Sequence, residues 1–201
     1  MRITCLDLEG VLIPEIWIGF AKKTGIEDLK LTTRDIPDYN VLMKKRLGIL
    51  EQHGLKLPDI QDVIATMSPL EGAKDFLDEL RSESQVVILS DTFYEFAAPF
   101  MRQLAWPTLF CHSLEVDAGG RIVDYHLRMT DQKKHAVEAF KNLNFSTVAV
   151  GDSYNDISML SAADQGIFFR PPETIRKEFP LFPVVSSYAE LRDQLKALTL
   201  K

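Results

Sequence analysis

The sequence predicts an α/β protein with a doubly wound, Rossmann-like parallel sheet and a small all-helical cap inserted after the first strand. Three short apolar runs, at residues 3–6, 86–89 and 148–150, are each followed by turn signals, as is typical of buried parallel strands. The segment between the first two runs shows helical patterns and no convincing strand, whereas strand and helix patterns alternate after residue 70. This order indicates a doubly wound sheet that carries one insertion.

The inserted segment is too long to be a simple crossover between two parallel strands. Its apolar spacing and its helix-stop glycines, Gly25 and Gly54, predict three amphipathic helices. We therefore expect a catalytic core formed by residues 1–13 and 71–201 and a helical cap domain formed by residues 14–70. The cap helices are expected over residues 15–23, 39–53 and 58–67.

The elements of the core follow from the same periodicities and turn signals. The segment Asp117-Ala-Gly-Gly120 lies between two strand-like runs and predicts a hairpin. Strands are expected to end at residues 6, 90 and 151, with hairpin strands over residues 108–115 and 122–128 and short strands over residues 166–169 and 184–185. Helices are expected over residues 71–81, 93–104, 133–142 and 157–163 and from residue 188 onward.

The composition excludes several classes of partner. A formal net charge of -6 and a pI near 5.3 argue against nucleic acid and against an anionic membrane surface, because both need a basic face. Two distant cysteines indicate no disulfide framework, and no apolar stretch approaches the roughly 18 residues that span a bilayer. We expect a cytoplasmic protein with a small-molecule substrate; its oligomeric state stays open, with a homodimer as one alternative.

Polar residues follow the apolar runs where each predicted strand ends. The carboxyl ends of parallel strands meet at one edge of a sheet, where α/β proteins bind ligands. Several carboxylates can share so small a volume only with a cation, because like charges disfavour joint ionisation. The sequence therefore implies a metal ion, and hard oxygen ligands favour Mg²⁺. The crevice is expected to collect Asp7, Glu9, Ser90, Asp152, Asn155 and Asp156.

Asp7 and Glu9 are the candidate catalytic pair. They lie two residues apart, so both side chains would point to one side if strand geometry continued past the first run. One carboxylate could then attack phosphorus to form an aspartyl-phosphate, and the other could protonate the leaving alkoxide and deprotonate the incoming water or alcohol. The alternative is an acidic turn after a strand.

Two further motifs have both a functional and a structural interpretation. Residues 151–156 place two acids around an asparagine, which suits Mg²⁺, but Asp152 or Ser153 could instead cap the next helix. The motif Ser90-Asp91-Thr92 could likewise be a helix cap. Its functional interpretation is a phosphate site made by the serine hydroxyl and the backbone N–H groups of a helix start.

Charged residues elsewhere are candidates for binding a substrate. A phosphoryl group beside these acids requires a nearby cation, and Lys133 and Lys134 at a predicted helix start are the candidates. Glu15 and Arg46 in the insertion are suited to hold the ammonium and carboxylate of an amino acid. For each of these residues the alternative is a solvated charge on a helix surface.

Taken together, the motifs resemble those of the haloacid dehalogenase superfamily, whose phosphotransferases use an aspartate nucleophile. The helical insertion resembles that of the phosphoserine phosphatases within it. Residues 7–17 and 89–96 closely resemble bacterial bifunctional members that also transfer phosphate from phosphoserine to homoserine. The stretches that match the superfamily motifs are, in order, residues 7–11, Ser90, Lys133 and residues 151–156.

This resemblance implies a metal site and two departures from the usual pattern. Mg²⁺ would be held by Asp7, the backbone carbonyl of Glu9 and Asp152, with Asp156 supporting the water shell of the metal. Glu9 stands where the superfamily usually has a second aspartate, and Val11 stands where it usually has threonine. The backbone carbonyl of residue 9 should still bind the metal with glutamate in place of aspartate. The reach and the pKa of the acid–base side chain are expected to differ.

The resemblance also implies an amino-acid pocket. Glu15 matches the carboxylate that reads the substrate ammonium, Arg46 the arginine that pairs with the substrate carboxylate, and Tyr39 a pocket aromatic residue. Asn155 is assigned to the same pocket, and Asp91 joins Ser90 and the lysine in binding phosphate.

The activity implied is Mg²⁺-dependent hydrolysis of O-phosphoserine through an aspartyl-phosphate, with phosphate transfer to homoserine as a second activity in serine and threonine biosynthesis. The partners would be a phosphoamino acid and an alcohol acceptor. One alternative is a phosphatase for another small metabolite, since a fold does not fix a substrate. Another is a non-catalytic regulator, which would be expected to have lost Asp7.

Overall fold

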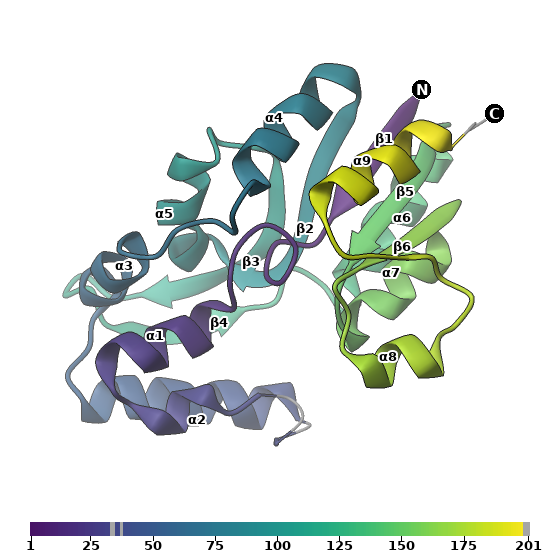
Figure 1. Ribbon diagram of the computed structural model, residues 1–201. Coiled ribbons are helices and arrows are strands. Elements are labelled where there is room, and N and C mark those ends of the chain that lie inside the picture. Colours follow the sequence, from purple (N-terminus) through teal and green to yellow (C-terminus); the bar gives the residue numbers. More distant parts are fainter. Residues whose placement is uncertain (33–34, 37, 199–201) are drawn as a thin grey trace.

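The computed structural model describes residues 1–32, 35–36 and 38–198, so parts of the predicted cap and the end of the predicted core lie outside the described residues (Figure 1). The strands are β1 (Arg2–Leu6), β2 (Gln85–Phe93), β3 (Leu109–Val116), β4 (Ile122–His126), β5 (Ser146–Gly151), β6 (Gln165–Phe169) and β7 (Val184–Val185). Between β1 and β2 lie α1 (Ile16–Thr24), the 3₁₀ turn η1 (Glu27–Lys30), α2 (Tyr39–Gln52), α3 (Leu57–Ala65) and α4 (Ala73–Glu83). The remaining helices are α5 (Tyr94–Gln103), α6 (Gln132–Asn142), η2 (Tyr154–Asp156), α7 (Ile157–Ala162), α8 (Glu173–Glu178) and α9 (Tyr188–Ala197).

The strands form one sheet in the order β4-β3-β2-β1-β5-β6-β7. β4 runs antiparallel to β3, and the other neighbouring strands run parallel. The chain adds β2 and β3 on one side of the central β1 and then β5, β6 and β7 on the other. The direction of winding therefore changes between β1 and β5, and α/β folds bind ligands at such a switch point. The predicted doubly wound fold, including its hairpin, is confirmed.

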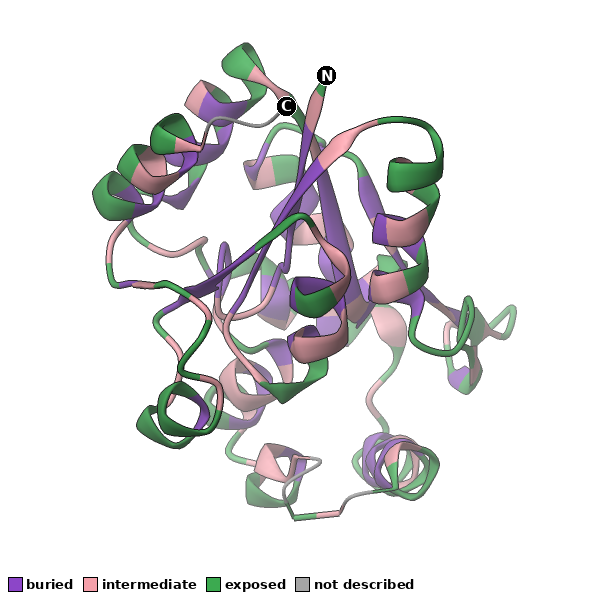
Figure 2. Ribbon diagram, turned by 90° about the vertical axis from the view of Figure 1, so that its right-hand side faces the viewer, coloured by how far each residue is buried: buried purple, intermediate pink, exposed green. Residues whose placement is uncertain are grey.

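The central strands are buried on both faces of the sheet, whereas the exposed residues lie on the outer sides of the helices, in the loops and on the hairpin strand β4 (Figure 2). Two apolar clusters cover the two faces. In β1, Cys5 packs in the cluster that contains residues of α6 and α7, whereas Leu6 packs in the cluster that contains residues of α4, α5 and α9. Ala149 and Val150 of β5 repeat this alternation. Because successive side chains of a strand point to opposite faces, a strand covered on both sides must be apolar throughout.

Helices α1, α2 and α3 gather at one end of the molecule, beside the β3–β4 hairpin and α5, whereas α4 packs on the sheet (Figure 1). The backbone N–H of Leu57 donates to the Gly120 carbonyl in the hairpin turn at 2.8 Å. Gln61 Nε2 donates to the Glu95 carbonyl on α5 at 2.7 Å. These two hydrogen bonds join α3 to the β3–β4 hairpin and to α5.

β2 is longer than the sequence predicts, which corrects the expected helix start at the Ser90-Asp91-Thr92 motif. The strand continues to Phe93, whose backbone pairs with His112 of β3 after a register shift, and α5 begins only at Tyr94. The threonine and phenylalanine after the serine and aspartate favour extended backbone, and the pairing with β3 keeps them in the sheet. The motif therefore does not cap α5.

The helix α8 (Glu173–Glu178) is not among the elements expected from the sequence. Pro172 occupies its N-cap position, and six residues are too few to show a helical period. Within the described part of the chain, none of the helices has the length and apolar character that crossing a membrane requires.

Candidate active site

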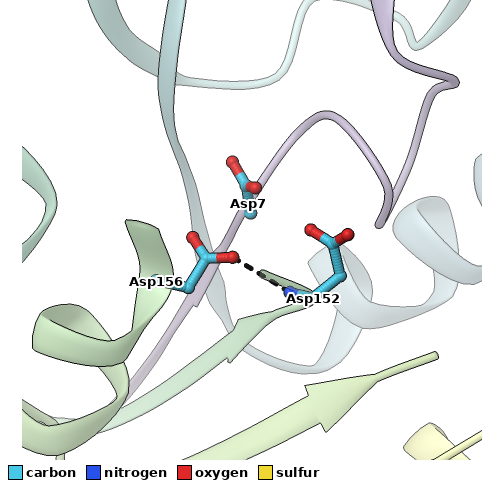
Figure 3. Close-up of side chains that lie close together, drawn as sticks. All are labelled: Asp7, Asp152 and Asp156. Atoms are coloured by element: carbon cyan, nitrogen blue, oxygen red, sulfur yellow. Dashed lines mark hydrogen bonds between the residues drawn. The ribbon is translucent and has the colours of Figure 1, made fainter. Parts of the chain in front are cut away.

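Asp7 directly follows β1 and lies in the interior of the protein (Figure 3). Its backbone N–H donates to the Val150 carbonyl at 2.9 Å, which ties it to β5 across the switch point. Only 4% of the residue is exposed. Its Oδ1 accepts hydrogen bonds from the Leu8 N–H at 2.8 Å and from Lys133 Nζ at 2.9 Å. These bonds to one oxygen fix the orientation of the carboxylate.

Lys133 supplies the positive charge of this buried cluster. It stands in the first turn of α6, is 2% exposed, and places Nζ 2.9 Å from Asp7 Oδ1 and 2.8 Å from Asp156 Oδ1. Burial alone would lower its pKa, but the surrounding carboxylates, Asp156 first, raise the pKa well above the ordinary lysine value. The side chain is therefore an ammonium. Lys134, the other candidate, has a side chain that is 42% exposed and pairs within its own helix.

Three carboxylates converge beside this lysine. One oxygen from each of Asp7, Asp152 and Asp156 lies within 4.8 Å of the others (Figure 3). Burial and then the charge of Asp156 raise the pKa of Asp7 well above its ordinary value and that of Asp152 to about 7. Asp152 Oδ1 is buried and has no hydrogen-bond partner among the described residues. An unpaired buried acceptor is costly, and a cation with oxygen ligands, such as Mg²⁺, fits this donor set.

Two glycines make room for these acids. Gly10 has a φ of 77°, and a Cβ at this position would lie 2.5 Å from the Asp152 carboxylate. A Cβ at Gly151 would collide with Asp156. Asp156 Oδ2 accepts hydrogen bonds from the backbone N–H of Asp152 at 2.9 Å, drawn in Figure 3, and of Ser153 at 3.1 Å. The turn after β5 therefore holds the Asp156 carboxylate in a fixed position.

Strand geometry does not extend to Glu9, so the spacing argument that pairs it with Asp7 is wrong. β1 ends at Leu6, and backbone bonds within residues 8–13 form a turn. Glu9 Oε2 accepts a hydrogen bond from the Ile16 N–H at 2.8 Å, at the start of α1. Burial, followed by the nearby charge of Glu15, raises the pKa of Glu9 to about 8. Glu9 is thus mainly protonated at neutral pH and has a proton to donate.

Arg46 is a buried cation contributed by the insertion. It lies on α2, is 7% exposed, and holds its guanidinium 4.5 Å from the centre of the Trp17 ring. One terminal nitrogen donates to the Leu31 carbonyl at 2.9 Å, while the buried Nε has no partner in the described part of the chain. Burial lowers the pKa of Arg46 to about 10, and the neighbouring acidic groups, Tyr39 first and then Glu9 and Glu15, oppose this effect. The guanidinium is charged and retains an unused donor.

Tyr39 connects the insertion to the end of β2. Its hydroxyl donates to the Asp91 carbonyl at 3.5 Å, and its ring meets the Tyr125 ring of β4 edge-on at 6.1 Å. Glu15 occupies the N-cap position of α1 and is exposed. The structure therefore places Tyr39 on the inner side of the insertion and Glu15 at its rim.

The end of β2 contributes Ser90 and Asp91. Ser90 is 1% exposed, and its hydroxyl accepts from the Thr92 N–H at 3.3 Å. The Asp91 carboxylate accepts from Asn155 Nδ2 at 2.9 Å and lies 3.5 Å from Lys133 Nζ. The exposed Asn155 thus joins the end of β2 to the turn after β5.

Gln132 and His112 belong to this cluster, although the sequence did not single them out. Gln132 is 1% exposed and donates from Nε2 to the Ser90 carbonyl and, at 3.3 Å, to Asp91. His112 Nε2 lies 3.7 Å from the same carboxylate. The only sequence signal for Gln132 is its place before Lys133. His112 carries no local signal, because the β2–β3 pairing brings it to the site.

Comparison with known proteins agrees with this arrangement. A family model described as haloacid dehalogenase-like hydrolase matches residues 2–164, a range that includes Asp7, Ser90, Lys133 and Asp152. The chain belongs to the haloacid dehalogenase-like hydrolase family. The resemblance inferred from the ordered motifs is thereby confirmed.

Two bacterial relatives of this haloacid dehalogenase-like hydrolase cover nearly all of its chain. It is 63% identical over 198 residues to the phosphoserine phosphatase ThrH of Pseudomonas aeruginosa, covering 98% of this chain and 97% of that protein. It is 60% identical over 194 residues to a phosphoserine phosphatase of Pseudomonas syringae pv. tomato, covering 96% of this chain and 82% of that protein.

Solved structures of more distant proteins share the fold. A phosphoserine phosphatase without ligand superimposes with a TM-score of 0.77 at 22% identity, covering 98% of this chain and 99% of the other. A phosphoserine phosphatase solved as a phospho-aspartyl intermediate analogue gives 0.74 at 23% identity, with the same coverage. At these identities the likeness shows a common architecture for this haloacid dehalogenase-like hydrolase.

Proposed function

We propose that this protein is an Mg²⁺-dependent phosphatase that hydrolyses O-phosphoserine through an aspartyl-phosphate at Asp7. The observation that carries the proposal is the buried pair of Asp7 and Lys133, 2.9 Å apart, beside Asp152 Oδ1, which has no hydrogen-bond partner among the described residues. This group combines a nucleophile, a cation for a phosphoryl oxygen and a position for a metal. The two Pseudomonas relatives, both called phosphoserine phosphatases, support the substrate at 63% and 60% identity.

The reaction is proposed to take two steps that share one acid–base group. A carboxylate oxygen of Asp7 attacks phosphorus, and the phosphorus–oxygen bond to serine breaks as Glu9 donates its proton to the departing serine oxygen. Water then attacks the phosphorus of the aspartyl-phosphate and gives a proton to Glu9, which releases phosphate and restores the Asp7 carboxylate. A pKa of about 8 for Glu9 suits both halves of this cycle at neutral pH.

The metal is proposed to lie between β1 and β5. Asp7, Asp152 and the backbone carbonyl of Glu9 would hold it, with Asp156 supporting the arrangement through its bonds to the turn after β5. When bound, Mg²⁺ supplies positive charge to the phosphoryl oxygens. The raised pKa values of Asp7 and Asp152 support this site, because a bound cation would stabilise their ionised forms.

The phosphoryl group is proposed to contact the end of β2 and the start of α6. Lys133 would bind one oxygen through its ammonium, and the Ser90 hydroxyl and the backbone N–H of Asp91 would bind others. Lys133 and Ser90 are buried, so these donors act in a region of low dielectric, where charge stabilisation is strongest.

Residues 14–70 are proposed to act as a cap domain over a core made of the rest of the chain. Arg46 is buried, its Nε has no partner within the part of the chain that the structure describes, and it would bind the substrate carboxylate. Glu15 at the rim would bind the ammonium, and Tyr39 and Asn155 would line the space between cap and core. Such a pocket fits an amino acid that carries both charges.

Arg46→Ala should raise KM for O-phosphoserine about 10- to 100-fold, because a lost charge-assisted hydrogen bond in a buried pocket is worth about 1.5 to 3 kcal/mol. The KM for O-phosphoethanolamine, which keeps the ammonium but lacks the carboxylate, should change much less. Steady-state phosphate release with both substrates measures the difference. Lys45→Ala, an exposed neighbour on the same helix, is the control and should change neither constant. Equal effects of Arg46→Ala on both substrates would contradict the pocket.

We further propose that homoserine can replace water as the acceptor of the phosphoryl group. The proposal rests on the likeness of residues 7–17 and 89–96 to bifunctional members of the superfamily and on two unusual residues. Glu9 is one methylene longer than aspartate, and the neighbouring Val11 is buried and apolar. Both features would disfavour a freely placed water relative to an alcohol that the cap holds in position.

Glu9→Asp should therefore shift the ratio of free phosphate to phosphohomoserine formed from phosphoserine at a fixed homoserine concentration. Positioning errors of about 1 Å can cost roughly 100-fold in rate, so shortening the acid should alter the two branches unequally. Both products can be measured in one reaction by ³¹P NMR. If both rates change by the same factor, acceptor choice is set by the cap and not by Glu9.

One assay tests the proposed function as a whole. Phosphate release from a panel of small phosphomonoesters is measured with Mg²⁺ or EDTA and with or without homoserine. We expect O-phosphoserine to have the highest kcat/KM and EDTA to abolish activity. A preference for another ester would favour a phosphatase for a different metabolite. Inactivity on the whole panel would favour a non-catalytic regulator.

A further inference from the structure

The Asp91 carboxylate is surrounded by nitrogen atoms from three different elements. Its oxygens lie 2.9 Å from Asn155 Nδ2, 3.3 Å from Gln132 Nε2, 3.5 Å from Lys133 Nζ and 3.7 Å from His112 Nε2. Burial alone would raise its pKa, but these neighbours, Lys133 first, hold the pKa below the ordinary value. The group is therefore a fixed negative charge at neutral pH.

The contact of this charge with Lys133 differs from the other two contacts of the ammonium. Lys133 Nζ lies 2.9 Å from Asp7 and 2.8 Å from Asp156, and both of these partners are buried. The third partner, Asp91, is farther away at 3.5 Å, and 37% of its side chain is exposed. An ammonium has three N–H groups. Two of them serve the buried carboxylates, so the third is left for Asp91, the only one of these three partners that is partly exposed.

A phosphoryl oxygen that reaches Lys133 must share or take this third N–H. The two buried carboxylates cannot give way, because each would be left as an uncompensated charge in the interior. Asp91 can give way at lower cost, since Asn155 and Gln132 continue to donate to it. Its charge nevertheless stays beside the phosphoryl group and repels it.

We propose that Asp91 is an internal counter-anion that competes with the phosphoryl group for Lys133, so that the site binds inorganic phosphate weakly and releases it quickly. The inference rests on the proposed function, because it assumes that Lys133 binds the phosphoryl group. The negative charge of the site exceeds the positive charge of the Lys133 ammonium and one Mg²⁺ ion even before phosphate enters. It comes from the four carboxylates of Asp7, Asp91, Asp152 and Asp156. Asp91 acts through Lys133 and is a positioning residue, not a catalytic one. Fast release matters because product release limits the turnover of many enzymes.

A purely structural role for Asp91 predicts the opposite result. If the carboxylate served only to hold Lys133, Gln132 and Asn155 in place, neutralising it would loosen these donors and weaken phosphate binding. If it competes with phosphate, neutralising it strengthens phosphate binding. The sign of the change in affinity separates the two roles.

The test is isothermal titration of inorganic phosphate into the full-length protein with saturating MgCl₂, for the wild type and Asp91→Asn. We expect Asp91→Asn to bind phosphate about tenfold more tightly, since removing a unit charge several ångströms from an anion in a partly screened site is worth about one factor of ten. Phosphate should also become a correspondingly stronger product inhibitor. Asp91→Ser provides a second neutral variant should the amide disturb folding. Unchanged or weaker binding in the folded variants overturns the proposal.

Asp131→Asn is the matched control. Asp131 is an exposed acid two residues before Lys133, but it accepts its hydrogen bond from Ser158 at 2.6 Å. Its φ of 49° is a conformation that asparagine tolerates well, so the substitution should preserve the start of α6. Phosphate affinity should stay within about twofold of the wild type, since an exposed charge is strongly screened. A gain equal to that of Asp91→Asn would mean that net charge alone sets affinity and would overturn the specific role of Asp91.

The titration separates this proposal from the proposed substrate. Inorganic phosphate carries no amino-acid group, so its binding does not depend on the cap pocket. A wild type that binds phosphate but does not hydrolyse phosphoserine would refute the substrate and leave the comparison of variants valid. Absence of phosphate binding at millimolar concentration with Mg²⁺ in both the wild type and Asp91→Asn would refute the proposed role of Asp91, whatever the activity on phosphoserine.

Discussion

Asp7→Asn is expected to lower kcat on phosphoserine by about 10⁴-fold or more, because an amide cannot form the aspartyl-phosphate. The same substitution should raise the free energy of unfolding of the metal-free protein by about 0.5 to 2 kcal/mol, because replacing an unfavourable functional group commonly stabilises a protein by this amount. The physical reason is that burial and the neighbouring acids raise the pKa of Asp7, so its ionised form is disfavoured in the folded state. Asparagine keeps an oxygen that can accept from Leu8 and Lys133.

The gain in stability has a defined pH dependence. The folded state holds a proton on Asp7 more tightly than the unfolded chain, whose pKa is near the ordinary 3.8. The penalty from Asp7 is therefore fully present above the raised folded pKa and absent below the unfolded value. Thermal unfolding in EDTA should show the variant above the wild type at pH 7 and equal to it near pH 3. Added Mg²⁺ should raise the Tm of the wild type more than that of Asp7→Asn. A variant that is less stable at pH 7 would contradict this electrostatic account.

Lys133→Met is expected to have the second largest effect, on both stability and activity. It leaves Asp7 and Asp156 in the interior without their ammonium partner, and removing one member of a buried ion pair costs about 3 to 5 kcal/mol. Loss of a preorganised charge beside the phosphoryl group should lower kcat/KM by about 10²- to 10³-fold. Chemical denaturation in EDTA measures the first effect, and phosphate release measures the second.

Lys134→Met is the control for this substitution. Lys134 is the next residue of α6, but its side chain is 42% exposed, and its Nζ lies 3.8 Å from Glu138 Oε1 on the same helix. Exposed pairs of this kind contribute little, so stability should change by no more than about 0.5 kcal/mol. Similar losses in the two variants would show that Lys133 acts only as a helix residue.

The fold could be predicted from the sequence because its signals are local. A strand covered on both faces of a sheet is a continuous apolar run, and β1 and β5 show this pattern in Cys5, Leu6, Ala149 and Val150. The end of β2 could not be predicted in the same way. Whether Phe93 stays in the sheet depends on its pairing with β3, a contact that joins distant parts of the chain.

The arrangement of the site likewise depends partly on local sequence signals and partly on contacts between distant parts of the chain. The turn signal after each strand indicates where Asp7 and Asp152 lie, since strand ends share one edge of a parallel sheet. The contacts of Gln132 and His112 with Asp91 have no counterpart in local sequence, because they form only when α6, β2 and β3 are packed together. Spacing alone does not position Glu9, because a turn and the start of α1 determine where its side chain lies.

The most direct test of the central claim is chemical trapping of the intermediate. The wild-type protein is mixed with O-phosphoserine and Mg²⁺, quenched in acid within milliseconds, and digested for mass spectrometry. We predict one phosphoryl group on Asp7 that is stable in acid, lost in alkali or hydroxylamine, and absent from Asp7→Asn. Rapid phosphate release without this label, or a phosphoryl group on Ser90 instead, would contradict the mechanism.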